Sequence, residues 1–228
     1  MAIAGIALAC LVLAGAGLSY FLLGSHRAPS EFTLSASPGS GSADALGGTW
    51  KVAAGSQVGY RAREQFINQP APTEAVARTS KVAGAMQIAV AGSSYRVSSI
   101  DFTADLSSLV SRDKYATFQT YQRDFFVRRI YLETDFYPKA EFKGGGIDVP
   151  MNVAPGPATL QATGMLTVHG VSKPVTTSLQ AQLSGANLEV VGSISVDMRD
   201  YNVDPPDISF TKAEPGVVIE YHLILART

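Results

Sequence analysis

Three histidines are the residues of this chain best suited to chemistry, because imidazole binds metals and transfers protons near neutral pH. His26 lies in a segment of small residues, while His169 and His222 fall within alternating, strand-like patterns. None of them has a second ligand-type residue at the spacing that a zinc site uses. We therefore expect no metal site, with His169 at a strand end or facing solvent and His222 on the polar side of its strand.

The chain also lacks the usual signals of nucleophilic catalysis and of phosphate binding. It contains no Gly-x-Ser-x-Gly elbow, and its single cysteine, Cys10, lies inside an apolar N-terminal run. The triple glycine at 144–146 lacks the Lys-Ser/Thr pair and the helix of a P-loop. Carboxylates are numerous, but their spacing pairs no two of them as acid and base. We predict that they are solvated strand and loop positions.

Two pairs of arginines are candidates for holding an anionic group. They are Arg61 with Arg63, and Arg128 with Arg129. Guanidinium groups bind phosphate or pyrophosphate through charge-assisted hydrogen bonds, and Arg61 and Arg128 are our candidate ligands. The alternative is that the arginines pair with nearby acids such as Glu64 and Glu133. The net charge of −1 gives no support to nucleic-acid binding.

Strands must position most of these side chains. Apolar and polar residues alternate over 100–106, 175–183, 188–198 and 217–225, between turns rich in Gly, Pro, Asn and Asp. This period of two is typical of antiparallel sheets with one buried face. About eight such strands bury their apolar faces only in a sandwich or a closed barrel, and the pattern does not choose between them. Aromatic residues at helix-like spacing predict one short helix within 113–134.

The first residues differ from the rest of the chain. Residues 1–24 are uncharged and almost wholly apolar, and a helix of this length spans a bilayer core of about 30 Å. We expect a transmembrane anchor. A cleaved signal peptide with a small-residue site at 14–16, and a lipoprotein signal ending at Cys10, are the alternatives. Arg27 after the segment would by itself favour a cytoplasmic domain.

Residues 25–48, rich in Ser, Gly and Pro, predict a flexible tether to a domain over 49–228.

Several motifs follow one another between Trp50 and Leu225. They are Ser56-Gln57-Val58-Gly59-Tyr60, residues 99–109, Tyr137-Pro138, the stretch Gly164 to Val175, and Asp200-Tyr201-Asn202-Val203. Together they resemble the YceI-like polyisoprenoid-binding family. The resemblance implies an extended, lipocalin-like antiparallel β-barrel of about eight strands with an elongated apolar cavity. It also implies an exported bacterial protein that binds a long isoprenoid lipid, with a quinone or pyrophosphate head, and that is not an enzyme.

These expectations give one picture of the protein and two rivals. The domain would lie on the extracytoplasmic side of a bacterial membrane, held by a single-pass helix, with the lipid as ligand, no other cofactor, and a homodimer left open. The predicted ligand-binding residues are aromatic side chains near the cavity openings together with the two arginines: Tyr60, Phe102, Phe118, Phe125, Phe136, Arg61 and Arg128. One rival is an enzyme acting on an isoprenoid or quinone through His169 or Asp200. The other is a structural or adaptor barrel with a filled core.

Overall fold

The structure, a computed structural model, describes residues 26–36, 46–67, 69–92, 94–115, 120–150 and 157–228. Its strands are β1 (His26–Arg27), β2 (Gly48–Val52), β3 (Gln57–Phe66), β4 (Thr73–Thr79), β5 (Val82–Ala91), β6 (Ser94–Asp105), β7 (Val110–Ser111), β8 (Lys114–Tyr115), β9 (Lys139–Gly144), β10 (Ile147–Pro150), β11 (Ala158–Val168), β12 (Val171–Ser184), β13 (Asn187–Asp197), β14 (Asp207–Ile208) and β15 (Thr211–Arg227). One short helix, α2 (Thr120–Phe126), continues into a π-helical turn, Val127–Tyr131.

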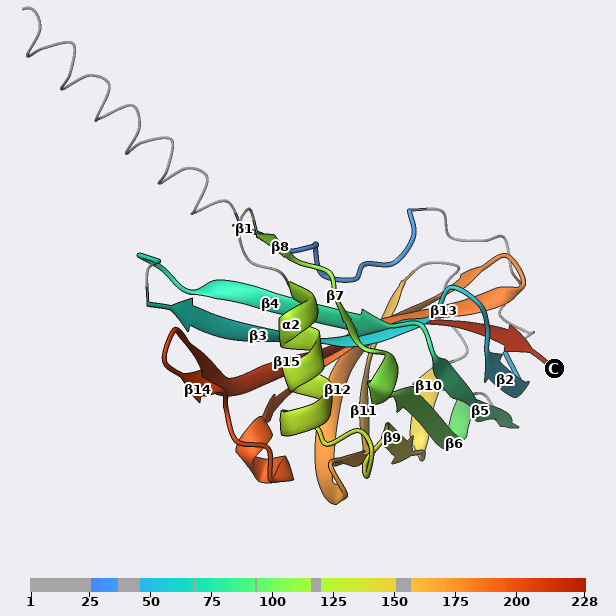
Figure 1. The fold of residues 1–228 in the computed structure, drawn as a ribbon. Helices are drawn as coiled ribbons and strands as arrows, with labels where there is room; N and C mark the ends of the chain where they lie inside the picture. Colours follow the sequence, from blue (N-terminus) through green and yellow to red (C-terminus); the bar gives the residue numbers. More distant parts are fainter. Residues whose placement is uncertain (1–25, 37–45, 68, 93, 116–119, 151–156) are drawn as a thin grey trace, which may run out of the picture.

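Eight strands close into an antiparallel barrel in the order β13, β12, β11, β9, β6, β5, β2 and β15 (Figure 1). The barrel closes because β15 pairs with β13 along most of its length and with β2 at its C-terminal end. The all-β barrel of about eight strands with a short helical insertion, predicted from the alternating pattern and the family resemblance, is therefore confirmed. Full closure leaves these eight strands without a free edge.

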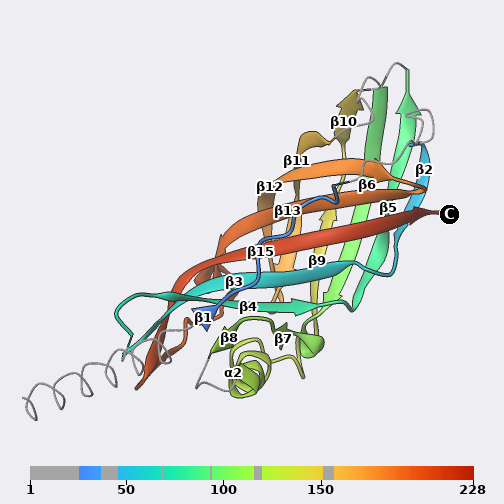
Figure 2. The same cartoon turned by 90° about the horizontal axis from the view of Figure 1, so that it is seen from above.

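The wall of the barrel changes along its length because β15 is long. Its last residues pair with β2, whereas Thr211 to His222 pair with β3, which continues the wall through β4 and β7. Figure 2 shows α2, β7 and β8 gathered at this end, with β10 and the C-terminus at the other. The two ends are therefore built differently: one from strands alone, the other from strands, α2 and loops.

The largest apolar core cluster lies at the strand-only end. Trp50 and Leu225 are fully buried there, and Trp50 donates its indole hydrogen to the carbonyl oxygen of Leu46 at 2.8 Å. Smaller clusters lie towards α2, around Leu106 and around Tyr201. Because inward-facing residues alternate along each strand, the strands predicted from period two supply Ile100, Leu188, Val190, Leu223 and Leu225 to the largest cluster.

The hairpin between β11 and β12 explains the conspicuous His169. His169 and Gly170 both have positive φ, as a two-residue type I′ turn requires. The His169 ring lies 4.5 Å from the ring of Tyr137, and its Nε2 is hydrogen-bonded to Glu133 at 2.8 Å. His169 therefore joins this hairpin to the segment that returns from the helix to β9.

Residues 26–36, the described part of the predicted tether, lie along the outside of the barrel and are called the strap below (Figure 2). Arg61 and Arg78 donate hydrogen bonds to the carbonyl oxygens of Pro29 and Ser30, at 2.8 and 2.7 Å. Further along, Ser35 donates to Glu189 at 2.7 Å. In the described ranges, no helix has the length and apolar character needed to cross a bilayer. The predicted anchor, residues 1–24, lies outside those ranges.

Candidate functional site

A cavity of about 200 Å³ fills the strand-only end of the barrel and is called the closed compartment. Aliphatic side chains from six or more strands line it, including Ile88, Val97, Leu179 and Leu188. The hydroxyls of Thr177 and Tyr221 in its lining are hydrogen-bonded to each other at 2.7 Å. Burial raises the pKa of Tyr221 to about 12, as expected in a dry environment. Of the described side chains that line this compartment, none is exposed.

A larger cavity of about 510 Å³ lies beneath α2 and is called the open compartment. It is lined by β3, the N-terminal half of β15, α2 with its π-helical turn, and the loop that precedes β14. Four of its apolar lining residues are about half exposed and mark its mouth: Phe126, Ile130, Ile208 and Phe210. Figure 1 shows α2 and β14 at this end of the molecule. The open compartment therefore communicates with solvent.

The two compartments adjoin each other and are together called the channel. Val58, Ala104, Ala140 and Ile219 line both of them. Ala104 on β6 and Ala140 on β9 are register partners, so two small side chains face the passage side by side. These four residues therefore lie at the boundary between the two cavities.

The open compartment differs from the closed one in its polar groups. Three buried polar atoms of its lining have no hydrogen-bond partner among the described residues: Nε of Arg123, the hydroxyl of Tyr201 and Oγ1 of Thr211. Buried polar atoms in proteins are nearly always paired, and leaving one unpaired costs about 1–3 kcal/mol. These three groups are therefore the polar atoms of the lining that no described residue satisfies.

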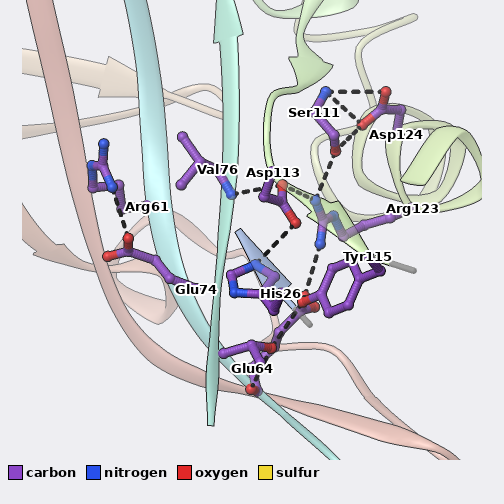
Figure 3. A network of polar contacts seen from close by, with 11 residues as sticks. His26, Arg61, Glu64, Glu74, Val76, Ser111, Asp113, Tyr115, Arg123 and Asp124 are labelled. Atoms are coloured by element: carbon purple, nitrogen blue, oxygen red, sulfur yellow. Dashed lines mark hydrogen bonds and ion pairs between the residues drawn. The ribbon is translucent and has the colours of Figure 1, made fainter. Parts of the chain in front are cut away.

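A buried ionic network holds α2 over this compartment (Figure 3). Arg123 of α2 donates to Glu64 of β3 at 2.7 Å and also to Asp113, whose other oxygen lies 3.5 Å from His26. Tyr115 donates to Glu64 at 2.6 Å. Burial would lower the pKa of Arg123, but the carboxylates of Glu64 and Asp113 outweigh it and raise that pKa. Arg123 therefore stays charged and clamps the helix in place.

The same burial acts on the acid of the pair. Desolvation raises the pKa of Glu64 above its ordinary value, while Arg123 and the Tyr115 hydroxyl oppose the rise. Burial likewise raises the pKa of Tyr60, which lines the same compartment. Both shifts follow from a poorly hydrated environment around the inner face of α2.

The structure brings two of the predicted ligand-binding residues into the channel. Phe102 lines the closed compartment and Tyr60 the open one. Phe125 and Phe136 are exposed, at 51% and 78%, and lie outside the lining of both compartments. Phe118 lies outside the described residues. Helical geometry separates Phe125 from its neighbour Phe126, which does line the open compartment.

The two predicted arginines lie away from the channel. Arg61 is on the outer face of β3 beneath the strap, with its Nε 2.6 Å from Glu220 and its Nη1 2.7 Å from Glu74. It faces outwards because Tyr60, the preceding residue of the same strand, faces inwards. Arg128 donates to the carbonyl oxygen of Leu109 at 3.1 Å. Neither side chain lines either compartment.

Sequence reasoning missed Arg123, Tyr201 and Thr211. Thr211 has the same phase along β15 as Val217 and Ile219, so extending the alternation by three steps of two residues, across the irregularity between Ala213 and Val217, would have found it. Tyr201 belongs to the motif at 200–203, but the motif alone does not give its orientation. Arg123 has no sequence signal, because only the packing of α2 against β3 turns its side chain inwards.

The residues proposed for a catalytic rival lie elsewhere. Asp200 is exposed and pairs with Lys173 at 3.1 Å, and His169 is held in the hairpin described above. Neither lines the channel. Within the part of the chain that the structure describes, no group of three or more His, Cys, Asp or Glu residues is placed to hold a metal ion.

Comparison with known proteins relates this chain to a protein family. A polyisoprenoid-binding domain from Saccharophagus degradans, implicated in plant cell wall breakdown, aligns with a TM-score of 0.56 and 16% identity, covering 79% of this chain and 98% of its own. BcnA from Burkholderia cenocepacia aligns with a TM-score of 0.52 and 21% identity, covering 76% and 98%. At such identities these structures support the fold alone. No curated protein gives a significant match. The model of the YceI-like domain matches residues 50–224. The chain therefore belongs to the YceI-like family, as its ordered motifs predicted.

Proposed function

We propose that this protein binds a long isoprenoid lipid, of polyprenyl or isoprenoid-quinone type, inside the channel and sequesters or shuttles it at the extracytoplasmic face of a bacterial membrane. The observation that carries the proposal is the pair of adjoining apolar cavities, one lined by no exposed side chain and the other lined by side chains with unpaired polar atoms. A long hydrocarbon chain with a polar head has the same asymmetry.

The energetics of burial support such a ligand. Each methylene removed from water contributes about 0.8 kcal/mol, so one five-carbon isoprene unit contributes up to about 3–4 kcal/mol. Three or four buried units exceed the roughly 8 kcal/mol of micromolar binding and leave a surplus against the costs of ordering the chain. The apolar lining therefore needs no specific contact to the tail.

The polar groups suggest how the lipid lies. The closed compartment would hold the tail, because its lining is apolar and its one hydroxyl pair is already satisfied. The head would lie in the open compartment near Arg123, Tyr201 and Thr211, whose free donors suit carbonyl or phosphate oxygens. A positive charge held between two carboxylates favours a neutral or weakly anionic head over a free pyrophosphate.

The proposal is for a carrier and not for an enzyme. It is supported by the position of His169 and Asp200 outside the channel lining, and by the name of the Saccharophagus degradans domain, which shares the fold. Anchoring through residues 1–24 would keep the barrel at the membrane that supplies the lipid and raise its local concentration there. The ligand's chain length is left to experiment.

The test is extraction of the purified full-length protein with organic solvent, followed by mass spectrometry. We expect an isoprenoid lipid in stoichiometric amount. Phe102→Asp places a charge in the closed compartment and should abolish copurification, whereas Phe102→Leu should retain it. A clean extract that stays clean after titration with polyprenyl and quinone lipids would support the ligand-free barrel. A chemically altered lipid after incubation would support the enzyme.

A further inference from the structure

We propose that the mouth of the open compartment is a docking surface for the lipid bilayer itself; this inference rests on the proposed function, because it assumes that the lipid comes from a membrane. The surface, called the apolar rim below, consists of exposed apolar residues from α2 and its π-helical turn on one side and from the β3 end and the β14 loop on the other. Its members are Ile67, Tyr121, Phe125, Phe126, Ile130, Ile208 and Phe210.

The residues of the apolar rim lie on or next to the elements that line the open compartment. Their exposed fractions lie between 42% and 73%, and four of them also line the open compartment. The backbone amide of Ile67 donates to the carbonyl oxygen of Phe210 at 3.0 Å, which joins the β3 end to the β14 loop. Single exposed apolar residues are ordinary, but a group around a cavity mouth marks an interaction site.

The position of the N-terminal segment favours a bilayer as the occupant of this surface. Residues 1–24 are uncharged and apolar over a length that suits a membrane span. The chain enters the described structure at β1, which pairs with β8 beside α2 (Figure 2). Two residues separate Leu23 from His26, and the three Cα–Cα steps between them reach at most about 11 Å. A bilayer that held the segment would therefore lie next to the apolar rim.

The strap fixes this geometry. His26 pairs with Tyr115 in the β1–β8 ladder, and its Nε2 lies 3.5 Å from Asp113, which Arg123 also contacts. The entry point of the chain and the helix that carries half of the apolar rim are thus held by the same buried network (Figure 3). The orientation of the mouth relative to an anchor would be set by this network and not by a free linker.

The charges near the entry point suit a bilayer with anionic lipids. Arg27, Arg112 and Lys114 are exposed, and none of them makes an ion pair with another described residue. Basic residues next to a membrane span are attracted by anionic head groups. Tyr and Phe side chains are likewise suited to the interface between head groups and acyl chains.

The opposite end of the barrel provides a natural control. Val90, at the end of β5, is exposed at 61%, and it lies on the hairpin to β6 next to the closed compartment. The chain's single tryptophan, Trp50, is 2% exposed in the core at that end. A tryptophan introduced at either end can therefore be observed against a buried, constant background.

The experiment uses the full-length protein in vesicles of phosphatidylcholine and phosphatidylglycerol that carry nitroxide-labelled acyl chains. Tyr121→Trp reports on the apolar rim without touching the channel lining, and Val90→Trp is the matched control. We expect quenching of Tyr121→Trp several-fold stronger than that of Val90→Trp, with wild type unquenched. Equal quenching at both ends, or none at Tyr121→Trp, would overturn the proposal.

Two further results separate this inference from its rivals. If Tyr121→Trp is shielded but not quenched, and the shielding grows with protein concentration, the apolar rim is a contact between copies of the chain and the bilayer proposal fails. Lipid extraction is measured on the same samples. Copurified isoprenoid without quenching overturns docking and leaves the carrier function standing. Quenching together with an extract that stays clean after titration with polyprenyl and quinone lipids supports docking and removes the carrier function.

Discussion

The closed and open compartments occupy one barrel but are built by different means. Apart from Leu46, the closed compartment is lined by residues of strands that pair with neighbouring strands. The open compartment also depends on α2, a π-helical turn and the η4 turn, Met198–Tyr201. Regular strands produce a uniform apolar wall, whereas these irregular segments bring in charged and hydroxyl groups. The barrel strands therefore form the apolar walls, and the irregular segments contribute the polar groups.

The largest expected effect comes from a change at the boundary between the two compartments. Ala104 and Ala140 face it as register partners, and both are small. Ala140→Phe should close the passage and leave only the open compartment to a ligand. Because each isoprene unit contributes up to about 3–4 kcal/mol, long isoprenoids should lose at least about a hundredfold in affinity. Titration with a chain-length series, short to long, measures the effect.

The control for this change is the exposed neighbour Lys139, which alternates to the outside of β9. Lys139→Phe should bind all chain lengths as wild type does. If a folded Ala140→Phe variant binds the longest isoprenoid with unchanged affinity, the tail does not pass between the compartments, and the single-channel description fails.

Loss of the Arg123 ion pairs should destabilise the α2 end of the barrel more than the opposite end. Removing one partner of a buried ionic network leaves the others unpaired, so Arg123→Ala should lower the free energy of unfolding by about 3 kcal/mol. The loss should be concentrated in faster amide hydrogen exchange of α2 and β7–β8, with β12 and β13 little changed. Urea unfolding and hydrogen exchange followed by mass spectrometry give both values.

A surface ion pair on the same segment serves as comparison. Arg129 pairs with Asp135, and about half of each side chain is exposed. Arg129→Ala should therefore change stability by less than about 1 kcal/mol. Exchange that accelerates equally at both ends of the barrel in Arg123→Ala would mean that the helix is part of one cooperative unit and not a separate clamp.

The sequence predicted the orientation of residues on strands better than that of residues on the short helix. The alternating faces at 175–183, 188–198 and 217–225 are the faces that line the channel, because period two leaves no freedom about which residues point the same way. Applied to neighbours, the same rule separates Tyr60 from Arg61, which the prediction had placed together. Phe125 and Arg123 depended instead on the orientation of one short helix, and local sequence does not set that orientation.

The strap shows a second limit of composition. Small and polar residues predict a flexible tether, yet Arg61, Arg78 and Glu189 on the outer barrel surface hydrogen-bond the backbone of residues 29–35. These bonds use backbone groups that every residue has. The strap's own side chains add the Ser35 hydroxyl, which donates to Glu189, and the Phe32 ring, which lies 3.9 Å from the Arg78 guanidinium. The partners lie far away in the sequence, and only the folded barrel brings them under the strap.

The smallest expected effect concerns the free hydroxyls of the open compartment. Tyr201→Phe and Thr211→Val each remove a buried hydroxyl that has no partner among the described residues, so the empty protein should be as stable as wild type or slightly more stable. If those hydroxyls bind a lipid head, affinity should fall about threefold to tenfold, the value of one hydrogen bond. Stability and affinity should therefore move in opposite directions.

The sharpest form of this test compares a lipid with its head-less hydrocarbon. Tyr201→Phe and Thr211→Val should weaken binding of the lipid only, because the hydrocarbon offers no acceptor. Tyr221→Phe removes a hydroxyl from the closed compartment, where it is bonded to Thr177, and should affect both ligands alike. If the open-compartment variants also affect both ligands alike, the head lies elsewhere. Arg123 would then serve only to hold α2 in place.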